Sequence, residues 1–343
     1  MKLNEKDLMQ HIKGGTAGLY VLYGEESYLT EQYARLIAKN TVDEDFDAFN
    51  LQRFDGQYLS LEQLEEAVES LPMMTDRKCV MVRDYDCGSG DTDRLLALIS
   101  DIPDSCVLVF WQMTVSPDQR KKGWKSFLDT AEKVGTVARF ERKTAADAAK
   151  MLVSGAKRRG CTLATEDAHA IVEMVGSNLQ QLISELDKLC ALAADGVITR
   201  AVIDSACTRN LEARVFDLSK TILAGNGSEA YALLGQLFAA REEPVSILGV
   251  LSSAYADLYR ANAARNAGVP ADSLAADFKS TYKGKEWRLR NAGRNVSRLS
   301  TEMLRDCVAI LADADTALKS GRGDARVLLE QTVARLLERG RRR

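Results

Sequence analysis

A glycine near the N-terminus marks the place where this sequence could bind a nucleotide. Gly24 directly follows the apolar run Leu19–Tyr23, and a phosphate-binding loop at this point requires the spacing Gly-x-x-x-x-Gly-Lys-Ser/Thr. In that motif, backbone N–H groups surround the phosphates and the lysine offsets their charge. Here Leu29 and Thr30 occupy the places of the second glycine and the lysine. The spacing therefore predicts no ATPase site in this loop.

Acidic residues around this loop do not restore such a site. Glu25 and Glu26 stand at the start of the following helical pattern, where they interact favourably with the helix dipole and would repel a phosphate. Asp84 and Asp86 follow a later apolar run and resemble the remnant of a Walker-B carboxylate. Without a phosphate loop we interpret both as part of a solvated turn. No catalytic residue is predicted.

Histidines and cysteines give little basis for a metal site or for nucleophilic catalysis. His11 and His169 are the only histidines in the 343 residues, too few for a histidine-based cluster. The seven cysteines form no Cys-x-x-Cys pair, which is typical of reduced, mostly buried thiols and predicts a cytoplasmic protein without metal or cofactor. They are Cys79, Cys87, Cys106, Cys161, Cys190, Cys207 and Cys307.

Membrane insertion and secretion are not expected either. The first residues, Met1 to Lys6, contain no apolar segment of the kind found in a secretory signal. No uninterrupted apolar run approaches the ~18 residues that a membrane-spanning helix needs.

One basic segment stands out although the chain as a whole has a formal net charge of −3. Between Lys279 and Arg298 there is a single acid, Glu286, and two aromatic residues, Tyr282 and Trp287. Such a segment could bind nucleic-acid phosphates, or equally the acidic face of a neighbouring protein. The candidate contact residues are Lys283, Lys285, Arg288, Arg290, Arg294 and Arg298.

The apolar pattern predicts which elements position these residues. Up to Phe140, β-rich runs alternate with amphipathic helical stretches, which predicts an α/β domain with a parallel five-stranded sheet. A helix with a capping box formed by Ser60 and Gln63 is expected to end at Pro72. The predicted strands are Leu19–Tyr23, Ala48–Arg53, Cys79–Arg83, Cys106–Trp111 and Thr136–Phe140.

Beyond Phe140 the pattern becomes helical and predicts two all-α domains. Thr144 and Thr165 are expected to cap short helices of a small domain over residues 141–209, and a last short helix is expected after Thr199. Longer helices follow over residues 210–343, one of them with Pro244 at its first position. The expected organisation is therefore an N-terminal domain over residues 1–140 followed by two helical domains.

Several segments resemble, in the right order, the delta subunits of bacterial DNA polymerase III, a family of AAA+-like clamp-loader subunits. These segments are Leu22–Leu29, Gly176–Leu189, Val215–Leu218 with the helix start at Glu243-Pro244, and Asp315–Gly321. The resemblance implies a clamp-binding domain without a phosphate loop, a helical lid, and a C-terminal collar domain that joins other loader subunits.

The resemblance also implies a function and partners. The chain would bind and open the beta sliding clamp during DNA replication, and would assemble with gamma or tau and delta-prime subunits around primer–template DNA. It would have no catalysis of its own within the polymerase holoenzyme. The alternative is a nucleotide-hydrolysing AAA+ motor subunit, which the sequence of the Gly24 loop disfavours. A stand-alone DNA-binding protein is disfavoured by the net charge of −3.

The short connection between the predicted helix that starts at Leu61 and the predicted strand Cys79–Arg83 contains the candidate clamp-binding residues. Two adjacent methionines are unusual in a connection between a helix and a strand, which is usually polar. From the connection alone, they either project outward or pack under the sheet. The resemblance favours binding, although family members often have phenylalanine or leucine there. The candidate residues are Leu71, Pro72, Met73 and Met74.

Overall fold

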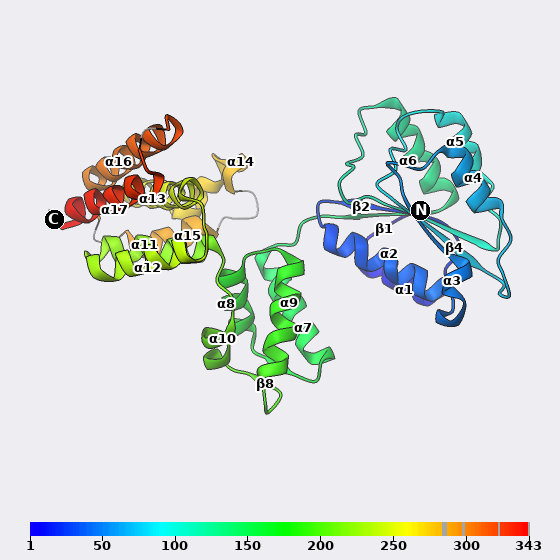
Figure 1. The fold of residues 1–343 in the computed structure, drawn as a ribbon, viewed down its shortest axis with the longest axis horizontal. Coiled ribbons are helices and arrows are strands. Elements are labelled where there is room, and N and C mark those ends of the chain that lie inside the picture. Colours follow the sequence, from blue (N-terminus) through cyan, green and yellow to red (C-terminus); the bar gives the residue numbers. More distant parts are fainter. Residues whose placement is uncertain (283–286, 297–298, 322, 342–343) are drawn as a thin grey trace. The chain divides into compact units, whose positions relative to one another are not determined.

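A computed structural model describes residues 1–282, 287–296, 299–321 and 323–341. The chain forms two compact units, Met1–Lys143 and Thr144–Arg343 (Figure 1). The division lies close to the boundary that the change of pattern after Phe140 predicts.

The first unit is built on a six-stranded sheet in which every pair of neighbouring strands is parallel. The predicted α/β class is therefore confirmed. The interior strands are apolar and almost completely buried because helices cover both faces of the sheet. In spatial order the strands are β1 (Lys2–Leu3), β6 (Thr136–Phe140), β2 (Gly18–Gly24), β5 (Cys106–Trp111), β4 (Lys78–Arg83) and β3 (Leu51–Asp55).

Two details of the sheet differ from the predicted strands. β1 has only two residues, too few to produce a recognisable pattern, and adds a sixth strand beside β6. The second predicted strand, Ala48–Arg53, begins later than expected because Asp47–Asn50 forms the short helix α3. This shift places Asn50 immediately before β3 instead of inside it.

Helices cover both faces of this sheet (Figure 1). One apolar cluster packs α4, α5 and α6 against alternate residues of β2, β4 and β5. α1 and α2 lie on the opposite face. The helices of this unit are α1 (Glu5–Lys13), α2 (Ser27–Thr41), the 3-10 helix η1 (Glu44–Phe46), α3, α4 (Leu61–Glu69), α5 (Thr92–Ser100) and α6 (Lys122–Val134).

The second unit begins with four short helices, whose start signals are mostly as predicted. Thr144 and Thr199 cap α7 and α10, while Thr165 is the first helical residue of α8 and Ala164 takes the cap position. A two-residue parallel ladder, β7 (Thr162–Leu163) with β8 (Val197–Ile198), adds strands that the helical pattern did not indicate. The helices are α7 (Ala145–Arg158), α8 (Thr165–Val175), α9 (Leu179–Leu192) and α10 (Arg200–Ala206).

The rest of this unit is helical and has an apolar core whose members run from Val215 to Leu337. Pro244 stands in the first turn of α13, as predicted. Since Thr144–Arg343 forms one compact unit, a separate lid over residues 141–209 and a separate collar over residues 210–343 remain predictions. The elements are α11 (Leu211–Leu223), α12 (Gly227–Ala239), α13 (Pro244–Asn266), η2 (Ala271–Ala276), α14 (Lys279–Tyr282), α15 (Trp287–Asn295), α16 (Thr301–Lys319) and α17 (Ala325–Arg341).

Candidate functional site

The connection between α4 and β4 presents apolar side chains to solvent. Leu71 is 83% exposed, Met73 55% and Met74 82%, while Pro72 is half-buried. The alternative that both methionines pack under the sheet is therefore wrong. Because contact between apolar side chains and water is unfavourable, adjacent exposed apolar residues on one short segment are candidates for binding a partner.

Local sequence explains where this connection begins. Ser60 accepts a hydrogen bond from the Gln63 N–H at 3.2 Å, and the Gln63 side chain accepts one from the Ser60 N–H at 3.0 Å. This capping box starts α4 as predicted, and the helix ends at Glu69 with Ser70 as its C-cap. Proline disfavours helical backbone in the residue before it, so Pro72 keeps the chain from continuing the helix.

Asn50 fixes the middle of the connection. Its side chain is 1% exposed and forms two hydrogen bonds with the backbone of Met73. The Met73 N–H donates to Asn50 Oδ1 at 2.7 Å, and Asn50 Nδ2 donates to the Met73 carbonyl at 2.8 Å. Asn50 Nδ2 also lies 3.3 Å from the carbonyl of Phe46, which it can reach as a second acceptor. The backbone of Met73 is therefore tied to the start of β3.

Lys78 holds the C-terminal end of α4 in place. Only 2% of this lysine is exposed, and burial lowers the pKa of its ammonium group. Nζ donates to the Ala67 carbonyl at 2.6 Å, to Ser70 Oγ at 2.8 Å and to the Ser70 carbonyl. A cation at these carbonyls satisfies acceptors that the last helical turn leaves without partners.

The backbone conformation of Met74 requires that the connection be held by contacts such as those of Asn50 and Lys78. Met74 has a φ of +58°, in the left-handed region that side chains other than glycine, asparagine and aspartate rarely adopt. Such a conformation persists where surrounding contacts determine it. On the far side, the Arg77 guanidinium donates to the Thr16 carbonyl, and Thr75 Oγ1 donates to the Arg77 carbonyl at 2.9 Å. The connection is thus held at both ends.

Sequence reasoning missed Asn50 and Lys78 as parts of this site. Lysine is ordinarily interpreted as a solvent-exposed residue, and Asn50 lay inside a predicted strand. Asparagine is depleted in strands, and this was the one available signal. Phe49, the neighbour of Asn50, is also 56% exposed.

The loop after β2 packs against the end of β6. A Cβ added at Gly24, where φ is +143°, would collide with the Phe140 carbonyl. Glu26 is 7% exposed at the N-cap of α2, and its N–H donates to the same carbonyl at 3.1 Å. Burial raises the pKa of Glu26, although hydrogen bonding to the Lys143 N–H opposes the shift. A buried acidic residue thus stands at the start of α2, the end of a helix at which a phosphate would bind.

Asp84 is not in a solvated turn, contrary to the prediction. It is 5% exposed, and its Oδ1 accepts backbone hydrogen bonds from Met113, Thr114 and Val115 at 2.6, 2.8 and 3.2 Å. Burial acts to raise the pKa of Asp84, but these donors outweigh it and lower the pKa. Its role is to fix the chain after β5. Asp86 is exposed and accepts from the Gly88 N–H, as a turn residue does.

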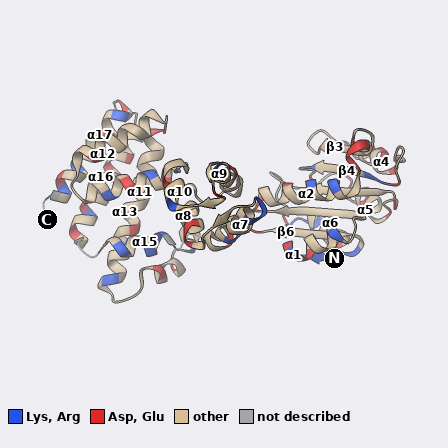
Figure 2. Cartoon of the chain, turned by 90° about the horizontal axis from the view of Figure 1, so that it is seen from below, with Lys and Arg blue, Asp and Glu red and all other residues tan. Residues whose placement is uncertain are grey.

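The basic segment is only partly described. Lys283, Lys285 and Arg298 lie outside the described residues. Arg288 on α15 is directed inward to the buried Asp257, with Nε 2.9 Å from Oδ2. Arg290 and Arg294 on the same helix are exposed, and Arg290 pairs with Asp272 at 3.3 Å. In Figure 2 basic and acidic positions are interspersed along the described helices of both units.

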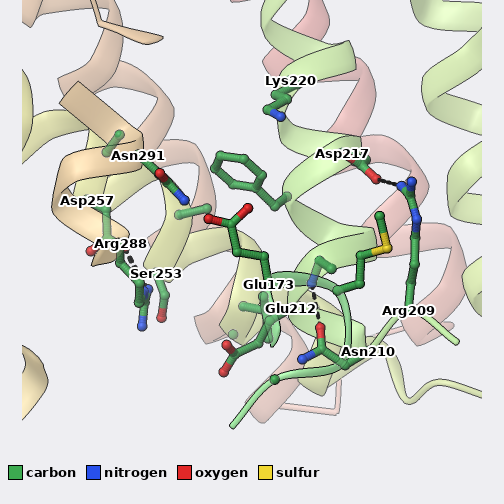
Figure 3. A pocket seen from close by; sticks show the side chains of 18 of the residues that line it. Glu173, Arg209, Asn210, Glu212, Asp217, Lys220, Ser253, Asp257, Arg288 and Asn291 are labelled. Carbon is green, nitrogen blue, oxygen red and sulfur yellow. Dashed lines mark hydrogen bonds and ion pairs between the residues drawn. The ribbon is translucent and has the colours of Figure 1, made fainter. Parts of the chain in front are cut away.

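A cavity of about 350 Å³ lies within the second unit, lined by residues of α8, α11, α13 and α15 (Figure 3). Arg209 pairs with Asp217, and Arg288 pairs with Asp257. Lys220 lies over the Phe216 ring, 4.5 Å from its centroid. The basic side chains that line the cavity already have partners within the chain. The lining therefore does not predict whether a ligand of the cavity would be anionic or cationic.

The part of the chain that the structure describes contains neither a cluster of potential metal ligands nor a membrane-spanning helix. Within it, no three histidine, cysteine, aspartate or glutamate side chains gather as a metal site would require. None of the helices over those same residues combines the length and apolar character that crossing a membrane requires.

Known proteins match this chain along most of its length. Residues 20–140 match the family model described as DNA polymerase III, delta subunit, and residues 212–336 match the model for the C-terminal domain of that subunit. DNA polymerase III subunit delta of Bacillus subtilis is 26% identical over 337 residues, 95% of each chain. The solved structure of the Bacillus subtilis DNA clamp loader delta protein matches with a TM-score of 0.62 and 25% identity, covering 97% of this chain and 99% of that one.

Proposed function

Because this chain belongs to the DNA polymerase III delta subunit family, whose members are clamp-loader subunits, we propose that it binds the beta sliding clamp and opens the ring for loading on primed DNA. The main support for this proposal is the exposure of Met73 and Met74 on a connection whose backbone is fixed. Leu71, Pro72, Met73 and Met74 are the proposed contact residues.

Their chemistry suits an apolar pocket on a partner. Methionine is unbranched and polarizable, so it fills irregular pockets that a rigid aromatic ring fits less well. A few buried apolar anchors commonly provide most of the free energy of a protein–protein interface. Since Asn50 already holds the backbone of Met73, little further ordering of this segment is required on binding.

Opening of the ring follows from preferential binding and requires no chemistry in this chain. A subunit shifts the clamp toward an open state if it binds that state more tightly than the closed one. We propose that the chain itself neither binds nor hydrolyses ATP, because Leu29 and Thr30 stand where a phosphate loop has glycine and lysine and because the buried Glu26 stands at the start of α2. Within the loader, nucleotide hydrolysis then belongs to other subunits.

The second unit would carry the assembly function. We assign a lid to residues 141–209 and a collar to residues 210–343, through which the chain would join gamma or tau and delta-prime subunits. Its large apolar core between α11 and α17 gives the rigid helical scaffold that such a role needs. Of the basic residues on α15, Arg290 and Arg294 are exposed and are the better candidates for contact with DNA or a neighbouring protein, since Arg288 is bonded to Asp257.

Binding and opening are tested with the purified full chain and the beta clamp from the same organism. Calorimetry measures binding, and release of a clamp preloaded on nicked circular DNA measures opening, because only an open ring leaves a circle. We expect saturable binding and faster release than without the chain. Absence of binding at micromolar clamp would refute the proposal, whereas binding without release would refute opening alone.

A further inference from the structure

The buried side chain of Asn50 links the exposed segment around Met73 to a distant part of the sequence. Met73 and Asn50 are separated by 23 residues along the chain, yet both hydrogen-bonding groups of the Met73 backbone are used by this one side chain. β3 and β4 pair in parallel with Leu51 opposite Cys79, so Asn50 lies at the edge of the sheet where the connection from α4 enters β4. The contact therefore depends on the pairing of β3 with β4 and on the path of the connection between α4 and β4.

We infer that Asn50 is a positioning residue for clamp binding, because its side chain holds Met73 and Met74 in the conformation that the clamp would receive. This inference rests on the proposed function of the Leu71–Met74 segment. Asn50 itself is 1% exposed, so it acts through the methionines and does not contact the clamp.

The backbone angle of Met74 explains why a positioning residue is needed. With φ at +58° and 82% of its surface exposed, Met74 has few contacts of its own to maintain a left-handed conformation. Lys78 fixes the end of α4 and Arg77 fixes the strand side, but neither forms a hydrogen bond to Met73 among the described contacts. Without Asn50 the segment would populate other conformations.

Such freedom weakens binding in a predictable way. If only a fraction of molecules has the competent conformation, the apparent dissociation constant rises by the reciprocal of that fraction. A competent fraction of about one tenth in Asn50→Ala would raise the dissociation constant about tenfold. The methionine side chains themselves remain present, so the loss would reflect conformation and not removed contact area.

A double-mutant cycle distinguishes positioning from a general loss of stability. Clamp affinity is measured calorimetrically, well below the melting temperature, for the full chain and for Asn50→Ala, Met73→Ala/Met74→Ala and their combination. We expect Asn50→Ala to lose about tenfold in affinity in the parent chain and almost nothing in the double-alanine background. Equal losses in both backgrounds, or no loss in the parent chain, would overturn the inference.

Asn262→Ala is the matched control. Asn262 is also a buried asparagine, 2% exposed, and it bonds the Leu299 carbonyl at 2.9 Å and the Thr301 hydroxyl at 2.7 Å, but it belongs to the second unit. It should lower the melting temperature as Asn50→Ala does and leave clamp affinity unchanged. If it weakens clamp binding equally, Asn50 has no positioning role.

Hydrogen exchange provides a readout that needs no clamp. The Met73 N–H is protected by Asn50 Oδ1 in the parent chain, so Asn50→Ala should accelerate its exchange while amides of β4 and β5 stay protected. Asn50→Asp keeps the hydrogen-bond acceptor but loses the donor, so it should retain part of the protection. It replaces the alanine variant in this experiment if the alanine variant does not fold. Unchanged Met73 exchange in these variants would refute the inference, even if the parent chain binds the clamp. Failure of the parent chain to bind would instead refute the proposed function.

Discussion

Truncation of Met73 and Met74 to alanine provides the most direct quantitative test of the proposed clamp contact. Full burial of a methionine side chain contributes about 1.5 to 3 kcal/mol. With Met73 55% and Met74 82% exposed in the free chain, burial of their remaining surface in a clamp pocket would contribute roughly 2 to 4 kcal/mol together. The dissociation constant should therefore rise roughly 30- to 1,000-fold in the double variant.

Folding should respond very differently from binding. Side chains that are mostly exposed contribute little to the core, so the double variant should lose at most about 0.5 kcal/mol of unfolding free energy. Met81 on β4 offers the matched control because it is 4% exposed. Met81→Ala should cost about 2 to 5 kcal/mol of stability and leave the clamp affinity of folded molecules nearly unchanged.

Calorimetric titration with the clamp and thermal melting, both on one preparation of each variant, separate these outcomes. A double-alanine variant with parent-like affinity and a parent-like melting temperature would show that the methionines take no part in binding. A lowered melting temperature with unchanged affinity would show that they belong to the core, in conflict with their exposure. Either result would refute the reasoning from side-chain burial.

Three further predictions concern other parts of the chain. The full chain should show no saturable ATP binding by calorimetry at micromolar concentration and no hydrolysis above background, because Leu29 and Thr30 replace the glycine and lysine of a phosphate loop. Measurable turnover would contradict this. The fragment Met1–Lys143 should bind the clamp, and Thr144–Arg343 should join the other loader subunits without it; clamp binding by the second fragment alone would reverse the assignment. Asp84→Asn should cost about 1 to 3 kcal/mol of unfolding free energy at pH 7, since a charged acceptor of three N–H groups becomes neutral. The pKa of Asp84 is lowered in the folded state, so its stabilisation is complete above the ordinary value of 3.8 and is lost as the pH falls through the lower folded value. The difference between the parent and this variant in denaturant titrations should therefore shrink below about pH 4, and a constant difference would be inconsistent with a charge effect.

The class of the first unit and the positions of most of its elements follow from local sequence. Continuous apolar runs such as Cys106–Trp111 predict strands buried on both faces, and this pattern is a local property of the chain. The capping box at Ser60 and the absence of glycine and lysine at Leu29 and Thr30 are local as well. They could be recognised without knowing which strands become neighbours.

How the candidate site is held depends instead on tertiary contacts. Asn50 meets Met73 because β3 pairs with β4, and Asp84 meets the residues after β5 because β4 pairs with β5. Lys78 can be buried because carbonyl groups at the end of α4 accept hydrogen bonds from its ammonium group. From residue type alone, each of these polar groups is expected to be exposed. A hydrogen bond between groups far apart in the chain depends on strand register and burial, and neither is encoded in the neighbourhood of one residue.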